Sequence, residues 1–150
     1  CKGGNADLLV ELFEMTNTEI FAHTTGEFGA GRIGQIQKTS SIKFVETLEA
    51  KLNTRIVRTN KYFQTIKDIK SIAVLPGSGT QFLDEVITKA DVFITGDISH
   101  RYLLKGDETN LGLIQVNHLS TEIPGMKRFV NNLSIELGTE LEYFYNKYYE

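Results

Sequence analysis

Three apolar segments decide the fold of this chain: SIAVLPG (residues 71–77), ADVFITGD (residues 90–97) and GLIQVNH (residues 112–118). Each is a short run of apolar, often β-branched residues that ends in a polar or glycine-containing turn, as a buried strand does. The helical segments expected between and after them span residues 78–89, 99–110 and 120–138. Strands covered on both faces lose the period-two alternation of half-exposed strands. The pattern therefore predicts an α/β fold, with α-β-α layers around a mostly parallel sheet.

Upstream of these segments, the chain predicts one helix and one glycine-rich connection. Residues 6–15 (ADLLVELFEM) place most of their apolar side chains on one face, which favours a helix. The stretch HTTGEFGAGRIGQI (residues 23–36) predicts an ordered surface loop, because glycine tolerates positive φ and close backbone approach. This loop is the best candidate for an internal boundary. We therefore divide the chain into residues 1–35, the end of a preceding half with its connection, and residues 36–150, an α/β domain.

Three further elements complete the prediction. Residues 41–53 (SIKFVETLEAKLN) read as a helix with one apolar side, which Ser40 or Ser41 could cap. TRIVRT (residues 54–59) reads as a short strand. The aromatic-rich residues 140–149 read as a final strand, whose tyrosines are expected to pack rather than to stack against a ligand.

The composition narrows the classes of partner. The formal net charge is −3 and no long basic run is present, so nucleic acid is not an expected partner. No apolar stretch approaches the roughly 20 residues that a membrane span needs, and no secretory signal is visible at the start. The single cysteine, Cys1, excludes an intrachain disulfide, which suits a reducing compartment. The expected location is the cytoplasm, with no membrane partner.

Chemistry is expected where the strands end, because open α/β sheets bind ligands beyond the carboxyl ends of their strands. Three such ends stand out: Pro76-Gly77-Ser78-Gly79, Thr95-Gly96-Asp97 and Asn117-His118. Glu122 follows four residues after His118. A function carried by this chain should lie among these residues.

His118 and Glu122 are the candidate metal ligands. Imidazole and carboxylate both bind divalent ions such as zinc, iron or manganese. If the next helix begins near Ser120, with Pro124 in its first turn, both side chains can converge on the strand's end. A hydrogen-bonded structural histidine and a glutamate near a helix start would show the same spacing. Two ligands also cannot complete a site, because zinc alone usually needs four.

The other two strand ends each have a functional and a structural interpretation. Gly77, Ser78 and Gly79 could present backbone N–H groups to an anion. A tight strand-to-helix turn is the favoured interpretation, and Ser78 with Gln81 even fits a capping box. Asp97 and His100 could hold the metal ligands in place, relay a proton, or cap the following helix, and an N-cap is the commonest role for such an aspartate.

Three linked motifs carry a family resemblance. IAVLPGSGTQFLDEV, ADVFITGDISH and VNHLSTEIPGMKRFVNNL, in this order, resemble the C-terminal half of the Nif-three-like family, whose members are often called GTP cyclohydrolase I type 2 homologues. The resemblance covers about residues 26–150, and GGNADLLVELF at the start resembles the end of the family's first half. Two positions depart from the family pattern: Asn117 stands where glycine is common, and Arg101 stands where some members have a second histidine.

The resemblance implies a site for two divalent metal ions, built from a histidine pair, an aspartate, and a later histidine and glutamate. His118 and Glu122 match the last two. The other three lie upstream of the segment that matches Cys1, so the chain is expected to lack the family's N-terminal half. The resemblance also implies a ring-shaped homo-oligomer with its metal sites facing an internal cavity.

Two functions follow from this resemblance. The first is a metal-dependent hydrolase on a nucleotide-like or other small substrate, to which this chain contributes part of a two-metal site. The alternative is a non-enzymatic, ring-forming interaction or regulatory protein with a structural metal. A third interpretation, a plain α/β domain without a site, predicts that His118 is buried and hydrogen-bonded, with no open cleft beside it.

Overall fold

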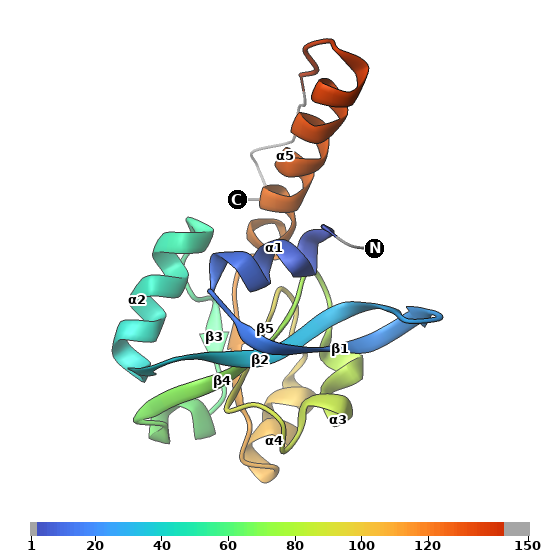
Figure 1. Ribbon diagram of the computed structural model, residues 1–150. Coiled ribbons are helices and arrows are strands. Elements are labelled where there is room, and N and C mark those ends of the chain that lie inside the picture. Colours follow the sequence, from blue (N-terminus) through green and yellow to red (C-terminus); the bar gives the residue numbers. More distant parts are fainter. Residues whose placement is uncertain (1–2, 143–150) are drawn as a thin grey trace.

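The computed structural model describes residues 3–142 and contains one six-stranded sheet with helices on both faces (Figure 1). The strands lie in the order β1-β2-β4-β5-β6-β3. Their bounds are β1 Thr16–Thr25, β2 Phe28–Ser40, β3 Arg58–Thr59, β4 Asp68–Leu75, β5 Val92–Thr95 and β6 Gly112–Gln115. The helices are α1 Asn5–Leu12, α2 Ser41–Leu52, α3 Leu83–Val86, α4 His100–Glu108 and α5 His118–Leu137, and Tyr62–Thr65 and Thr80–Phe82 form 3₁₀ turns.

The three apolar segments form the parallel centre of the sheet, as predicted. β4 pairs with β5, and β5 with β6, in parallel. Along β4, Ile72 and Val74 belong to the core beneath α1 and α2, whereas Ala73 and Leu75 belong to the core on the side of α3 and α4. All four side chains are buried, which explains why the sequence shows an unbroken apolar run.

The sheet is mixed, so the expectation of a mostly parallel sheet is wrong. β1 pairs with β2, β2 with β4, and β3 with β6, all antiparallel. The difference comes mainly from residues 23–36, which form much of the β1–β2 hairpin instead of a surface loop. Glycine suits this hairpin for a packing reason: Phe21 pairs with Gly31, and a Cβ on Gly31 would overlap the phenyl ring of Phe21. The boundary predicted after residue 35 falls inside β2.

Several predicted elements are found with changed bounds. Ser40 caps α2, and its side chain accepts a hydrogen bond from the backbone N–H of Lys43. The helix expected over residues 78–89 shrinks to a 3₁₀ turn followed by the four residues of α3. Of the strand expected over residues 54–59, only Arg58–Thr59 (β3) forms a strand. The predicted final strand lies almost wholly outside the described residues.

α5 begins two residues earlier than predicted, and this shift positions the site. Asn117 is its N-cap, and the Asn117 side chain accepts hydrogen bonds from the backbone N–H groups of Leu119 and Ser120. His118 is therefore the first residue of α5, and Pro124 lies in its second turn rather than its first. From there α5 runs away from the sheet, as Figure 1 shows in orange and red.

Within the described residues, no helix combines the length and the apolar character that crossing a membrane requires.

Candidate functional site

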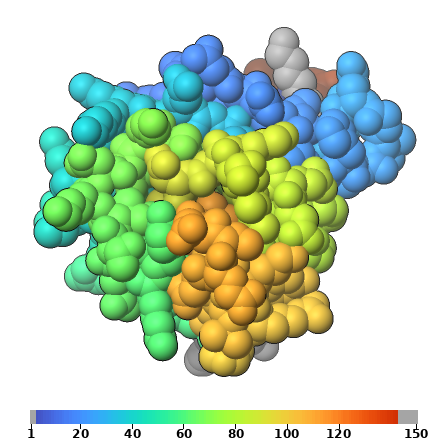
Figure 2. Space-filling view, turned by 90° about the horizontal axis from the view of Figure 1, so that it is seen from below, coloured from blue at the N-terminus to red at the C-terminus, as the bar shows by residue number. Residues whose placement is uncertain are grey.

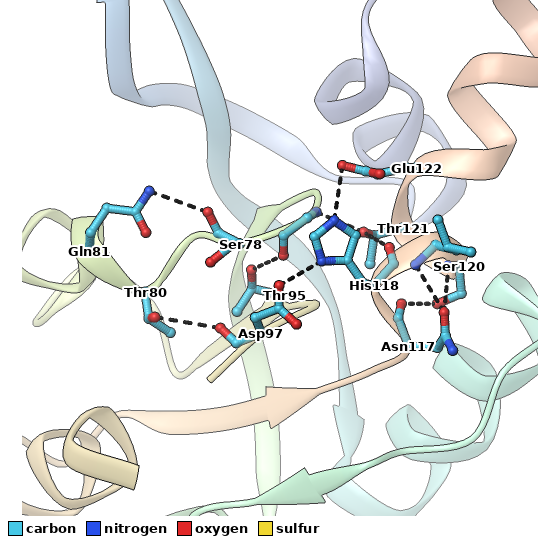
Figure 3. A network of polar contacts seen from close by, with 12 residues as sticks. Ser78, Thr80, Gln81, Thr95, Asp97, Asn117, His118, Ser120, Thr121 and Glu122 are labelled. Atoms are coloured by element: carbon cyan, nitrogen blue, oxygen red, sulfur yellow. Dashed lines mark hydrogen bonds and ion pairs between the residues drawn. The ribbon is translucent and has the colours of Figure 1, made fainter. Parts of the chain in front are cut away.

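The carboxyl ends of β4, β5 and β6 meet at one edge of the sheet, as predicted (Figure 3). The backbone carbonyl of Gly77, after β4, accepts hydrogen bonds from the Thr95 hydroxyl at 2.9 Å and from the Gly96 N–H at 2.7 Å. The N–H of Gly77 donates to the Thr121 hydroxyl of α5 at 2.9 Å. These buried hydrogen bonds hold the three strand ends together and fix the start of α5 against them.

His118 lies between two carboxylates. Its Nδ1 is 2.6 Å from Oδ2 of Asp97, and its Nε2 is 3.5 Å from Oε1 of Glu122. Because the carboxylate of Asp97 accepts, the Nδ1 of His118 carries a proton. In the neutral ring the lone pair then lies on Nε2, on the side of Glu122. The three side chains are 37–52% exposed, so a solute can reach them.

The exposure of His118 separates two interpretations of this residue. A purely structural histidine is expected to be buried, and the His118 side chain is 42% exposed, although it is hydrogen-bonded. A surface hollow of about 1060 Å³ is lined by Asn117 and Ser120, on either side of His118 in sequence, but not by His118 itself.

Glycine is required beside the pair. Gly77 has a φ of +71°, and a Cβ there would lie 2.7 Å from Oε1 of Glu122 and 3.3 Å from Nε2 of His118. Gly96 is equally close to α5, since a Cβ there would lie 2.7 Å from Cα of His118. The two glycines of the strand ends therefore make room for the imidazole and the carboxylate.

The pair has a separation that fits two ligands of one metal ion. Two such ligands about 2.0–2.2 Å from a zinc ion, at tetrahedral angles, lie about 3.4 Å apart. The observed separation of Nε2 and Oε1 is 3.5 Å. The hydrogen bond from His118 to Asp97 is also the arrangement by which metal-binding histidines are commonly oriented. Between residues 3 and 142, no group of three or more His, Cys, Asp or Glu side chains lies close enough to hold a metal.

The other predicted residues have different surroundings. Asp97 does not cap α4, whose N-cap is Ser99, and its carboxylate binds His118 instead. His100 is the exposed first residue of α4, and no side-chain hydrogen bond or ion pair links it to another described residue.

Gly77, Ser78 and Gly79 form a turn. The N–H of Gly77 already donates to the Thr121 hydroxyl, so it is not available to bind an anion. Ser78 and Gln81 do not form a capping box: the Gln81 side-chain amide donates to the Ser78 carbonyl at 3.3 Å.

Sequence reasoning named Asn117 and Thr95 at the strand ends but gave them no role, and it missed Thr121. An asparagine before a helix is a common N-cap, so Asn117 carried a signal that the later helix start concealed. Thr95 and Thr121 carried none, since their hydroxyl groups bind backbone that is distant in sequence.

Comparison with known proteins assigns the chain to one family. The family Duf34/NIF3 (NGG1p interacting factor 3) matches residues 1–148. A relative from Methanocaldococcus jannaschii, named GTP cyclohydrolase 1 type 2 homolog, is 32% identical over 94% of this chain and 56% of its own length. A relative of the same name from Pyrococcus abyssi is 28% identical over 91% of this chain and 54% of its own. The chain thus spans about half the length of the curated relatives it matches.

Solved structures agree with the fold. Reduced HcgD from Methanocaldococcus jannaschii matches with a TM-score of 0.75 and 29% identity, over 93% of this chain and 54% of that one. A Bacillus cereus protein related to NIF3 matches with a TM-score of 0.79 and 14% identity, over 98% of this chain and 68% of that one. The family predicted from the three linked motifs is confirmed, and the chain belongs to the Duf34/NIF3 family.

Proposed function

We propose that this chain contributes His118 and Glu122 to a divalent-metal site of a metal-dependent hydrolase. The observation that carries the proposal is the 3.5 Å separation of His118 Nε2 and Glu122 Oε1, with Nδ1 held by Asp97. The hydrogen bond to Asp97 fixes the tautomer, so Nε2 is free to donate its lone pair. Zinc, iron or manganese would suit this mixture of nitrogen and oxygen ligands.

The complete site needs ligands from outside residues 3–142, because the described residues supply a pair only. We propose that these come from the part of the family fold that this chain does not span, and that the full site holds two divalent ions. Metal ions held in such a site activate a water molecule and stabilise negative charge on a substrate oxygen. His118 would bind a metal ion through Nε2, and Glu122 would supply a carboxylate oxygen to the metal. Asp97 would orient the imidazole ring.

A nucleotide-like or other small substrate is the proposed class. The name of the relatives, GTP cyclohydrolase 1 type 2 homolog, supports a nucleotide-like molecule. The exposure of His118, Asp97 and Glu122 supports a site that a small molecule can reach.

The three histidines of the chain allow a direct test of the metal site. His23, His100 and His118 should give separate imidazole signals in ¹⁵N NMR spectra, and Mn²⁺ at low occupancy should broaden the His118 signals first. In His23→Ala and His100→Ala, Mn²⁺ should still broaden the His118 signals first. In His118→Ala, the signals of His23 and His100 should show no selective broadening at the same Mn²⁺ concentration. Equal broadening of all three histidines, or none at His118, would contradict the metal site.

The hydrolase part of the proposal has its own test. In a full-length protein that carries this half, Glu122→Gln should lower both metal content, measured by elemental mass spectrometry, and metal-dependent hydrolysis of a nucleoside triphosphate. Hydrolysis that persists in Glu122→Gln at wild-type rate would exclude the proposed role of this carboxylate.

A ring-forming interaction protein is the second candidate, and a surface of α5 favours it. Met126, Phe129 and Leu137 are 52%, 58% and 59% exposed. With Glu122 they recur at spacings of three, four and eight residues, so they lie on one side of the helix. These side chains follow Glu122 along α5, and this part of α5 leaves the sheet (Figure 1). We propose that a second copy of the chain covers it, which would also bring further side chains towards the incomplete metal site.

Light scattering after size exclusion tests this surface. Phe129→Glu should shift the chain towards the monomer, because it places a charge in an apolar contact. Lys127→Glu, an exposed change two residues away, is the control. A wild-type chain that is monomeric at high micromolar concentration would rule the contact out.

A further inference from the structure

A second surface hollow is lined by none of the residues proposed for the metal site. It is a hollow of about 360 Å³ between the 3₁₀ turn Thr80–Phe82 and α4. Seen from below in Figure 2, the yellow-green and amber segments that contain this turn and α4 lie side by side. The volume is within the range of roughly 300–1,000 Å³ that small-ligand pockets occupy.

Two cations line this hollow, and one of them has no acidic partner. Lys105 bridges the two walls by an ion pair of 2.5 Å with Asp84. Arg101, one helical turn earlier, makes no ion pair with any residue between 3 and 142. Its guanidinium instead lies 4.6 Å from the ring centroid of Tyr102 and donates one hydrogen bond, at 3.0 Å, to the Tyr102 hydroxyl. A guanidinium has five N–H donors, so most of those of Arg101 remain available to a ligand.

The hollow has a floor and a rim of different character. Leu83 is buried and the Tyr102 ring is half-buried, which gives an apolar floor. Gln81 and Thr80 add an amide and a hydroxyl to the cationic rim. An apolar floor with a few polar groups around it is the usual composition of a small-ligand site.

We propose that this hollow binds the phosphate group of a small phosphorylated molecule, with Arg101 as the main contact. The planar fork of arginine matches two phosphate oxygens, and its charge is not neutralised by a carboxylate. Lys105 lies on the same helix face, but its charge is paired with Asp84, so Arg101 supplies the net positive charge of the hollow. The partly buried Tyr102 would contact the apolar part of the ligand.

The position of the hollow connects it with the proposed metal site. The Thr80 hydroxyl donates to the backbone carbonyl of Asp97 at 3.5 Å, and the Asp97 carboxylate binds His118. Figure 3 shows Thr80 and His118 on opposite sides of Asp97. The path of contacts from the rim of the hollow to the imidazole therefore runs through Thr80 and Asp97. That the hollow orients a substrate rests on the proposed function, whereas phosphate binding itself needs no metal.

The test is titration of the ¹⁵N-labelled chain with inorganic phosphate, and separately with phenyl phosphate, at constant ionic strength and with EDTA present. The amide signals of Gln81, Arg101 and Lys105 should shift saturably, and phenyl phosphate should bind more tightly because its ring reaches the apolar floor. Arg101→Gln should raise the Kd for both probes about tenfold.

Arg55→Gln is the matched control, because Arg55 is an exposed arginine that pairs with Glu49 and does not line this hollow. It should leave both Kd values unchanged. The proposal is overturned if Arg101→Gln binds as wild type does, if Arg55→Gln weakens binding equally, or if shifts spread over lysines and arginines across the whole surface. EDTA keeps this result independent of the metal site, so either proposal can fail without the other.

Discussion

Asp97 and His118 lie 21 residues apart in the sequence, yet Oδ2 of Asp97 is 2.6 Å from Nδ1 of His118. β5 and β6 bring them together, because these parallel strands end at the same edge of the sheet. The carboxylate selects the tautomer of His118 and holds the ring with Nε2 on the side of Glu122.

Asp97→Asn tests whether this hydrogen bond supports metal binding. An amide can satisfy Nδ1 but carries no charge, so the affinity for Zn²⁺ should fall about 10–100-fold. Isothermal titration calorimetry measures the change. Asp68→Asn is the control, since Asp68 is an exposed carboxylate that pairs with Lys38 away from the site. Equal Zn²⁺ affinity in Asp97→Asn and wild type would show that Asp97 does not orient a ligand.

Gly77→Ala should destabilise the chain and disturb the site together. The backbone of Gly77 is left-handed, with φ +71°, and its new Cβ would lie 2.7 Å from Glu122 Oε1. Gly26→Ala is the matched control: Gly26 has φ +57° but nothing within 4 Å of its Cβ. Backbone strain alone should cost Gly26→Ala about 1–2 kcal/mol of unfolding free energy. Urea denaturation should show a larger loss of unfolding free energy for Gly77→Ala than for Gly26→Ala. Equal losses would mean that the close approach of the new Cβ to Glu122 does not destabilise the chain.

The Arg128–Glu11 contact predicts a pH dependence of stability. Arg128 of α5 donates to both carboxylate oxygens of Glu11 in α1, at 2.9 and 2.6 Å. This hydrogen bonding lowers the pKa of Glu11 from its ordinary 4.5 and raises the pKa of Arg128. Since the folded pKa of Glu11 is depressed, its stabilising contribution is present above pH 4.5 and is lost as the pH falls through the lowered value.

Two arginine variants separate the causes of lowered glutamate pKa values. The pKa of Glu49 is lowered first by the backbone N–H of Ile56 and only second by Arg55. Arg128→Gln should therefore return the pKa of Glu11 close to its ordinary value, whereas Arg55→Gln should leave most of the Glu49 shift in place. NMR titration of the glutamate side-chain carbons measures both. A Glu11 pKa that stays low in Arg128→Gln would contradict the assigned cause.

Arg32 joins α1 to the β1–β2 hairpin, and its loss should be costly. The Arg32 side chain is 10% exposed and forms an ion pair of 2.7 Å with Asp7. It also donates to the backbone carbonyls of Gly29 and Gly31, each at 2.8 Å. Arg32→Met keeps the apolar stem but removes the ion pair with Asp7 and the hydrogen bonds to both carbonyls. Because Asp7 is 25% exposed, the expected loss is about 2–3 kcal/mol, below the usual range for a fully buried pair.

Chemical denaturation of Arg32→Met beside Lys38→Met checks this value. Lys38 lies on the same strand and pairs with Asp68, but both side chains are more than half exposed. Its replacement should change the unfolding free energy by less than about 1 kcal/mol. Similar losses of unfolding free energy for the two substitutions would show that the burial of Arg32 does not strengthen its contribution to stability.

The sequence by itself determined the parts of this protein whose physics is local. Continuous apolar runs predicted β4, β5 and β6, because strands covered on both faces need apolar side chains in both directions. Ser40 or Ser41 predicted the start of α2, because a serine oxygen can bind the free N–H groups of a first helical turn, and the structure selects Ser40. The linked motifs also identified the family, and strand ends on one edge of a parallel sheet predicted which residues would meet.

Tertiary structure alone decided the rest. The glycine-rich residues 23–36 became strand rather than loop because Phe21 packs over Gly31, a contact that no local pattern encodes. Asp97 faces His118 instead of capping α4, because the start of α5 brings the imidazole to it across the strand ends. Gly77 stands beside Glu122 for the same reason. Each of these outcomes depends on segments far apart in the chain, and their contacts exist only once the sheet has formed.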